Sequence, residues 1–327
     1  MRPRSMPGTT VSILAMAGLA AACTGGAARS ATPVATPSPA TFTVQSDVSF
    51  ESANPLNQPG VLDVYAPVDP GPWPVVVMFH GDPSFASKGS TTPFAQHVAD
   101  RGFVVFAPTW GHSGGAAYDA LSLPDRLGAD LSQAACAVAF AQRRAPDYGG
   151  DPERVILFGH SAGGNIAAVL GFAAHEPTDG CLADERPAPV EAVVAFEGDW
   201  VLGDPSWDSA LVDEPTIYAM LTPWLNLADR PDLPLHLLAS SAPGLGRTDG
   251  EWVEARDPSG SIRRAFDAIG ALDDEYVGLD EVQAMLARML EGEGHPVTFR
   301  VLPQSTHMAL SEQGWQVFES LFEDLAL

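Results

Sequence analysis

Short apolar runs alternate with segments of helical periodicity along most of the chain. Most of the runs are rich in Val, Phe, Leu and Ala, and a nearly unbroken run of this length is typical of a buried strand. The runs predict strands at 61–66, 75–79, 103–107, 154–158, 192–196, 235–239 and 297–302. Apolar residues at helical spacing predict helices at 93–101, 127–144, 164–174, 280–292 and 312–325.

Strands that alternate with helices predict an α/β fold, a mostly parallel sheet of the eight-stranded type with helices on both faces. Two segments, near 198–233 and 241–278, interrupt the alternation. The first gathers Trp200, Trp207 and Trp224 among prolines and acidic residues, and the second is rich in Gly and Asp. Because each follows the carboxyl end of a strand, where open α/β sheets bind ligands, we expect cap-like insertions there.

The first residues have the pattern of an export signal. Arg2 and Arg4 precede an apolar run that is too short to span a bilayer. Basic residues before a short apolar run are typical of a signal peptide, which we expect at residues 1–22. The five residues that end at Cys23 resemble a bacterial lipobox, which implies lipid modification of Cys23. Residues 23–45 are rich in Thr, Ala, Pro and Ser and predict a flexible tether. We therefore expect an extracytoplasmic protein that is lipid-anchored to the membrane or secreted.

The charge of the chain narrows the classes of partner. Asp and Glu number 41 and Lys and Arg 17, a formal net charge of −24. A chain this acidic repels phosphate backbones and anionic membrane surfaces, so nucleic acid is not an expected partner. The N-terminal lipid is the one membrane contact that we expect.

Cysteine and histidine usage gives no sign of a structural metal. Apart from Cys23, the chain has Cys136 and Cys181, which outside the cytoplasm either form a disulfide or remain two buried thiols. No Cys-x-x-Cys motif is present and the 8 histidines are scattered, so no metal site is expected.

The segment 159–163, Gly-His-Ser-Ala-Gly, carries the strongest chemical signal. It follows the strand expected at 154–158 and runs directly into a helix, which is the setting that a G-x-S-x-G nucleophile turn requires. A second match at 111–115, around Ser113, is not followed by a clear helix. We therefore identify Ser161, and not Ser113, as the candidate nucleophile.

Two further segments follow strands at the same expected edge of the sheet. His80 and Gly81 come directly after the strand at 75–79, where a loop can supply a backbone N–H to a developing oxyanion. His307 lies between the last strand and the last helix, from where it can reach across the sheet to take a proton from the serine. The other histidines are less well placed.

These motifs, in this order, resemble those of the α/β-hydrolase family over residues 46–327. Residues 94–108 look like the esterase/lipase, cutinase and platelet-activating-factor-acetylhydrolase-like branches of that family. The resemblance implies hydrolysis of a carboxylic ester through an acyl-enzyme, without a cofactor. Ser161 would attack, His307 would take its proton, and the N–H groups of Asp82 and Ala162 would bind the oxyanion.

The resemblance also implies an acid between the serine and the histidine. The acid usually follows the strand before last, but no carboxylate follows 235–239 closely. Asp274 is preferred, because Asp-Glu-Tyr-Val-Gly resembles the family's D-x-x-V-P turn before a helix. The alternatives that stay open are Asp249, Glu197, Asp199 and Asp257.

Two other functions stay open from the sequence. The same residues would serve a serine peptidase of this fold, and a surface-binding lipoprotein without catalysis is the second alternative. The expected ligand is a small-molecule or lipid-like ester. The sequence sets neither the acyl chain nor the oligomeric state.

Overall fold

A computed structural model describes residues 42–50, 60–82, 86–111, 120–172, 189–198, 230–243, 245–247 and 276–327. Its main sheet has eight strands in the order β1-β2-β4-β3-β5-β6-β7-β10. These are β1 (Phe42–Phe50), β2 (Gly60–Pro67), β3 (Trp73–Phe79), β4 (Val104–Pro108), β5 (Gly150–His160), β6 (Ala192–Phe196), β7 (Leu235–Ala242) and β10 (Val297–Thr306). A small antiparallel pair joins β8 (Leu245–Arg247) to β9 (Tyr276–Gly278).

Seven of the eight strands run in one direction, and β2 runs opposite to them. β4, β3, β5, β6, β7 and β10 pair in parallel, whereas β1 and β2 pair antiparallel with each other and β2 with β4. The carboxyl ends of the parallel strands therefore meet at one edge of the sheet, which is the edge that carries ligand sites in open α/β sheets.

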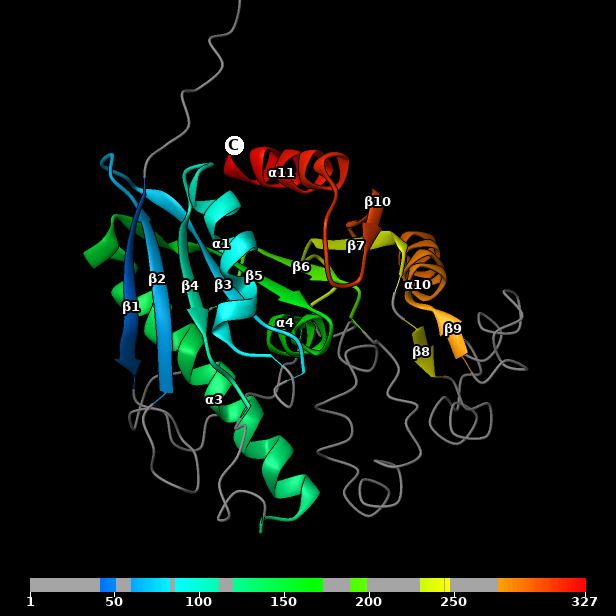
Figure 1. The fold of residues 1–327 in the computed structure, drawn as a ribbon, viewed down its shortest axis with the longest axis horizontal. Coiled ribbons are helices and arrows are strands. Elements are labelled where there is room, and N and C mark those ends of the chain that lie inside the picture. The colour runs from blue at the N-terminus through cyan, green and yellow to red at the C-terminus, as the bar shows by residue number, and fades with distance from the viewer. Residues whose placement is uncertain are drawn as a thin grey trace, which may run out of the picture. The chain divides into compact units, whose positions relative to one another are not determined.

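Helices cover both faces of the sheet (Figure 1). α3 (Leu123–Arg144), α4 (Ala162–Phe172) and α10 (Leu279–Glu293) pack on one face, and α1 (Thr92–Ala99) and α11 (Glu312–Ala326) on the other. Two short 3-10 helices, η1 (Lys88–Thr91) and η2 (Ala145–Tyr148), flank α1 and α3. Two apolar cores result, one on each face of the sheet.

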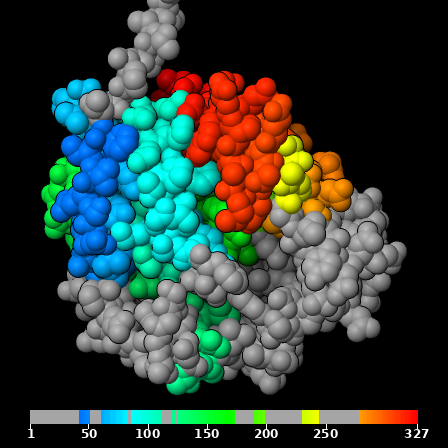
Figure 2. Space-filling model, in the orientation of Figure 1, coloured from blue at the N-terminus to red at the C-terminus, as the bar shows by residue number. Residues whose placement is uncertain are grey.

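Aromatic rings join α1 and α11 to the sheet. The ring of Phe318 lies 5.4 Å from that of Phe94 on α1 and 5.7 Å from that of Phe158 on β5. Trp315 adds a contact of 5.2 Å to Phe94. In the space-filling view, α1 in cyan and the red C-terminal residues lie side by side (Figure 2).

The seven predicted strands and five predicted helices are all present, with ends shifted by a few residues. The eighth strand, β1, was missed, and it overlaps the predicted tether 23–45. That boundary is wrong, because the strand begins at Phe42. The miss has a physical cause: β1 is an edge strand with mostly exposed side chains, so it lacks the apolar pattern that marks a buried strand.

Most of the predicted insertions, 198–233 and 241–278, lie outside the described residues, as do residues 1–41 with Cys23. Cys136, buried on α3, is disulfide-bonded, and Cys181 lies outside the described residues. Within the described part of the chain, no helix has the length and apolar character needed to cross a membrane.

The ring cluster yields a stability prediction. Phe318→Ala should lower the free energy of unfolding by roughly 3–5 kcal/mol, because it removes a fully buried ring and leaves a cavity between α11 and β5. Urea denaturation followed by circular dichroism measures the change. Val68→Ala, at a side chain that is 60% exposed, is the control and should change stability by less than about 0.5 kcal/mol. A loss below about 1 kcal/mol for Phe318→Ala would contradict the anchoring role of the cluster.

Candidate functional site

Four candidate residues each follow a parallel strand directly. His80 follows β3, Ser161 follows β5, Glu197 follows β6 and His307 follows β10. Since β3, β5, β6, β7 and β10 are consecutive neighbours in the sheet, all four residues lie at the same edge. The topology thus gathers side chains that are up to 227 residues apart in sequence, counted from His80 to His307.

The chain reverses sharply at Ser161, between β5 and α4. Ser161 has φ 55°, which is rare for a residue with a side chain, and its N–H donates to the Phe196 carbonyl at 2.8 Å. A Cβ on Gly159 would lie 1.9 Å from the Gly163 carbonyl oxygen, and one on Gly163 would lie 2.3 Å from that of His80. Both glycines are therefore required, and the turn has the geometry of a nucleophile turn. Ser113 lies outside the described residues.

His307 is paired with a carboxylate. Its Nδ1 lies 2.5 Å from Oε2 of Glu197, whose side chain is fully buried, while the His307 side chain is 23% exposed. A carboxylate acceptor at Nδ1 holds the proton there and leaves Nε2 as the basic nitrogen of the ring. The pair can therefore act as a general base with a fixed tautomer.

The sequence favours Asp274 as the acid, and the described carboxylate that bonds to His307 is that of Glu197, one of the alternatives left open. Asp274 lies outside the described residues, as do the alternatives Asp249, Asp199 and Asp257. The turn motif before α10 favours Asp274. The signal for Glu197 is positional, because Glu197 follows its strand directly, as Ser161 and His307 follow theirs.

Glu197 also has an unusual backbone. Its φ is 48°, and its N–H donates to the Leu238 carbonyl at 2.9 Å. A buried side chain held at positive φ is a strained arrangement, and such residues concentrate at functional sites. The strain supports the view that the fold is built to place this carboxylate.

The loop that carries His307 departs from regular strand geometry. Leu302 pairs with Ser240 and Thr306 pairs with Ala242, so β10 has two more residues than β7 between these pairs. Gln304 within this irregularity has φ 51°. The extra residues bend the end of β10, as a β-bulge does, and so redirect the residues that follow.

His160 ties the serine turn to the His307 loop. Its Nε2 lies 2.8 Å from the His307 carbonyl oxygen, and the two rings lie 4.6 Å apart. Burial, with a smaller effect of the neighbouring His307, lowers the pKa of His160 to about 4. His160 is therefore neutral at neutral pH, and because a carbonyl only accepts, Nε2 carries the proton and donates. The nucleophile and the base are thus joined through adjacent residues.

His80 fixes the loop on the other side of Ser161. Trp110 N–H donates to His80 Nε2 at 3.3 Å, so the proton is on Nδ1, which donates to the Gly81 carbonyl at 2.8 Å. Burial lowers the pKa of His80 to about 4, which agrees with a neutral ring. In a trans peptide the Asp82 N–H points opposite to the Gly81 carbonyl. Holding that carbonyl therefore sets the direction of the Asp82 N–H.

The Asp82 loop lies next to the nucleophile turn. A Cβ built on Gly81 would lie 3.4 Å from Cβ of Ser161. Ala162 is the first residue of α4, so its N–H is one of the donors that a helix leaves unpaired at its start. Gly81 and Ser161, the residues that precede Asp82 and Ala162, are therefore neighbours. The oxyanion-binding role of the Asp82 and Ala162 N–H groups stays a prediction.

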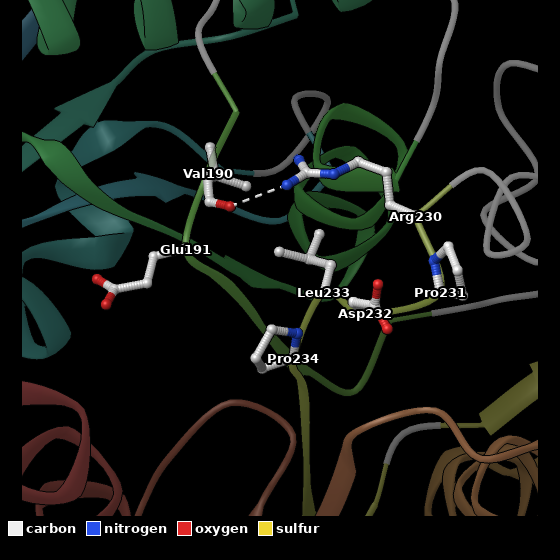
Figure 3. A pocket seen from close by; sticks show the side chains of 7 residues that line it. All are labelled: Val190, Glu191, Arg230, Pro231, Asp232, Leu233 and Pro234. Carbon is white, nitrogen blue, oxygen red and sulfur yellow. Dashed lines mark hydrogen bonds between the residues drawn. The ribbon is translucent and has the colours of Figure 1, made fainter.

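A cavity of about 450 Å³ lies elsewhere on the molecule, lined by residues 190–191 and 230–234 (Figure 3). These residues precede β6 and β7, so the cavity is at the amino edge of the sheet, opposite to Ser161. Arg230, one of the lining residues, donates to the carbonyls of Gly171 and Val190. Among the described residues, no group of histidines, cysteines and carboxylates could hold a metal ion.

Comparison with known proteins points to ester hydrolases. The BD-FAE family model matches residues 62–207. The probable carboxylic ester hydrolase LipM of Mycobacterium tuberculosis is 27% identical over 111 residues, which are 34% of this chain and 24% of that protein. A probable isoprenylcysteine alpha-carbonyl methylesterase, ICMEL1 of Oryza sativa subsp. japonica, is 32% identical over 146 residues, 43% of this chain and 32% of that protein. The matches span about a quarter to a third of these curated relatives.

Solved structures match over much more of the chain. A carbohydrate esterase from gut microbiota superimposes with a TM-score of 0.57 at 16% identity and covers 89% of this chain and 98% of its own. An esterase of Thermogutta terrifontis, solved with propionate, gives a TM-score of 0.58 at 16% identity and covers 85% and 93%. At such identities the likeness concerns the fold. Together with the order and direction of the strands, these comparisons show that the chain has the α/β-hydrolase fold.

Proposed function

We propose that the protein is a serine hydrolase that cleaves carboxylic esters, with Ser161 as nucleophile, His307 as general base and Glu197 as the acid. The observation that carries the proposal is the hydrogen bond from His307 to the buried Glu197, at the same sheet edge as a strained serine turn. Fold alone would not support it, because this type of fold hosts many reactions.

The first half of the reaction forms an acyl-enzyme. The Ser161 hydroxyl attacks the ester carbonyl while His307 Nε2 takes its proton. The resulting imidazolium is stabilised by the Glu197 carboxylate, which lies 2.5 Å from Nδ1. His307 then returns the proton to the leaving alcohol, and the acyl group remains on Ser161.

The oxyanion is bound by two backbone donors. The Asp82 N–H is oriented by the bond between His80 and Gly81, and the Ala162 N–H is at the start of α4, where the helix dipole favours negative charge. Neither donor has to reorganise during the reaction. In the second half, water attacks the acyl-enzyme with the same proton transfers in the same order.

The matched relatives support an ester as the substrate. Both curated relatives are named for ester hydrolysis, and the solved structures are called esterases. The proposed chemistry is completed by the residues of the chain and needs no cofactor. A small-molecule or lipid-like ester remains the proposed substrate class.

Replacement of the nucleophile tests the proposal first. Ser161→Ala should lower kcat/KM for p-nitrophenyl acetate and butyrate by roughly 10⁴-fold or more, since the attacking oxygen is lost. Ser113→Ala, in the second G-x-S-x-G match, is the control and should retain wild-type activity. Full activity of Ser161→Ala would refute the proposal. Loss of activity in Ser113→Ala alone would show that Ser113, and not Ser161, is the nucleophile.

The acid is tested by two amide substitutions of equal size. Glu197→Gln should lower kcat on the order of 10³- to 10⁴-fold, because an amide cannot stabilise the imidazolium of His307. Asp274→Asn should leave kcat within about twofold of the wild-type value. Removal of a buried charged partner of His307 would lower kcat much further. Steady-state kinetics of both variants at one pH decide between them. The reverse ranking would restore Asp274 as the acid.

We also propose that the protein is exported and anchored through a lipid on Cys23, as the lipobox-like sequence suggests. Cys23→Ser should release the protein from the membrane fraction or block removal of residues 1–22. Fractionation followed by mass spectrometry of the mature N-terminus measures both results. A mature N-terminus at another residue, without lipid, would contradict the anchor.

A further inference from the structure

Ser240 lies on β7 and is fully buried beside the proposed acid. Its N–H donates to Glu197 Oε1 at 2.6 Å, and its hydroxyl donates to the same oxygen at 2.5 Å. The other carboxylate oxygen, Oε2, receives the bond from His307. The carboxylate is therefore held from two sides, one oxygen by Ser240 and the other by the base.

The position of β7 explains why such a contact is needed. β7 lies between β6, which carries Glu197, and β10, which carries His307. Neighbouring strands are about 4.8 Å apart, so the Glu197 side chain has to cross β7 to reach His307. A flexible side chain that crosses a strand has several rotamers, and a contact from that strand can select one of them.

Ser240 occupies the place where the resemblance to the α/β-hydrolase family puts the acid itself, directly after 235–239. β7 supplies a hydrogen-bond donor at that place, and β6 supplies the carboxylate. A buried charge is stable only when it is well hydrogen-bonded, so a donor is the group that a carboxylate needs at this point.

The backbone of Glu197 is held separately by α10. With its amide oriented to satisfy its neighbours, the fully buried Gln283 accepts from the Gly198 N–H at 3.0 Å and shares the Glu197 N–H, at 2.8 Å, with the Leu238 carbonyl. The same amide donates to the Leu238 carbonyl at 2.7 Å. Since the strained backbone has this support of its own, the Ser240 hydroxyl acts on the carboxylate and not on the turn.

We propose that Ser240 is a positioning residue that holds the Glu197 carboxylate in register with His307 Nδ1. The inference rests on the proposed function and deepens it. It concerns turnover and not substrate binding, because the hydrogen bonds of Ser240 go to Glu197, so Ser240 acts through the carboxylate.

Ser240→Ala tests the proposal in the full-length enzyme. We expect kcat for p-nitrophenyl butyrate to fall roughly 10- to 100-fold with KM unchanged, which is the effect of losing one hydrogen bond to a charged group. Ser241→Ala, at an exposed neighbour on the same strand, is the control and should keep wild-type kinetics. Ser240→Cys has a similar volume and a weaker donor, and it should show the same loss if the alanine variant does not fold.

A double-mutant cycle separates positioning from a structural role. In the Glu197→Gln background, Ser240→Ala should cost less than about twofold in kcat, because the charge that Ser240 positions is already gone. An equal loss in both backgrounds, or wild-type kcat in Ser240→Ala, would overturn the inference. Ser161→Ala distinguishes the two claims: if it is inactive while Ser240→Ala is unimpaired, only the positioning role fails, and if it is fully active, the proposed function fails.

Discussion

The hydrogen bond between Glu197 and His307 joins two strands that are not neighbours in the sheet. It can form only because β5, β6, β7 and β10 run in parallel and end at one edge, with a candidate residue placed directly after β5, β6 and β10. It also needs a side chain long enough to cross β7, and glutamate reaches one methylene further than aspartate. The serine turn, the bend in β10 and the support from β7 and α10 all act to keep this bond in place.

Two neutral histidines hold the backbone at the site. His80 and His160 both have a pKa lowered to about 4 by burial, so each is a neutral ring with one donor and one acceptor. His80 uses its donor to orient the peptide before Asp82, and His160 uses its donor to hold the His307 loop. Neutral rings fix the backbone at the site without adding charge next to the base.

The sequence predicted the parts of the molecule that depend on local pattern. The apolar runs located seven strands, and the glycines at 159 and 163 identified Ser161 because no other residue fits that turn. β1 was missed because an exposed edge strand has no apolar pattern. Glu197 was ranked behind Asp274 because the choice of acid depends on which carboxylate the sheet order brings to His307. The contact of Ser240 with Glu197 was not predicted for the same reason, since the pairing of β6 with β7 joins residues 43 apart in the chain.

Identification of the residue that reacts covalently with an active-site probe tests the central claim most directly. A fluorophosphonate reacts with a serine only when a base takes its proton and donors stabilise the oxyanion, so labelling reports the assembled site and not the fold alone. The purified protein would be labelled, digested and mapped by mass spectrometry. The account predicts one label, on Ser161 in the peptide that contains residues 159–164. A label on Ser113, or no label on a folded protein, would contradict it.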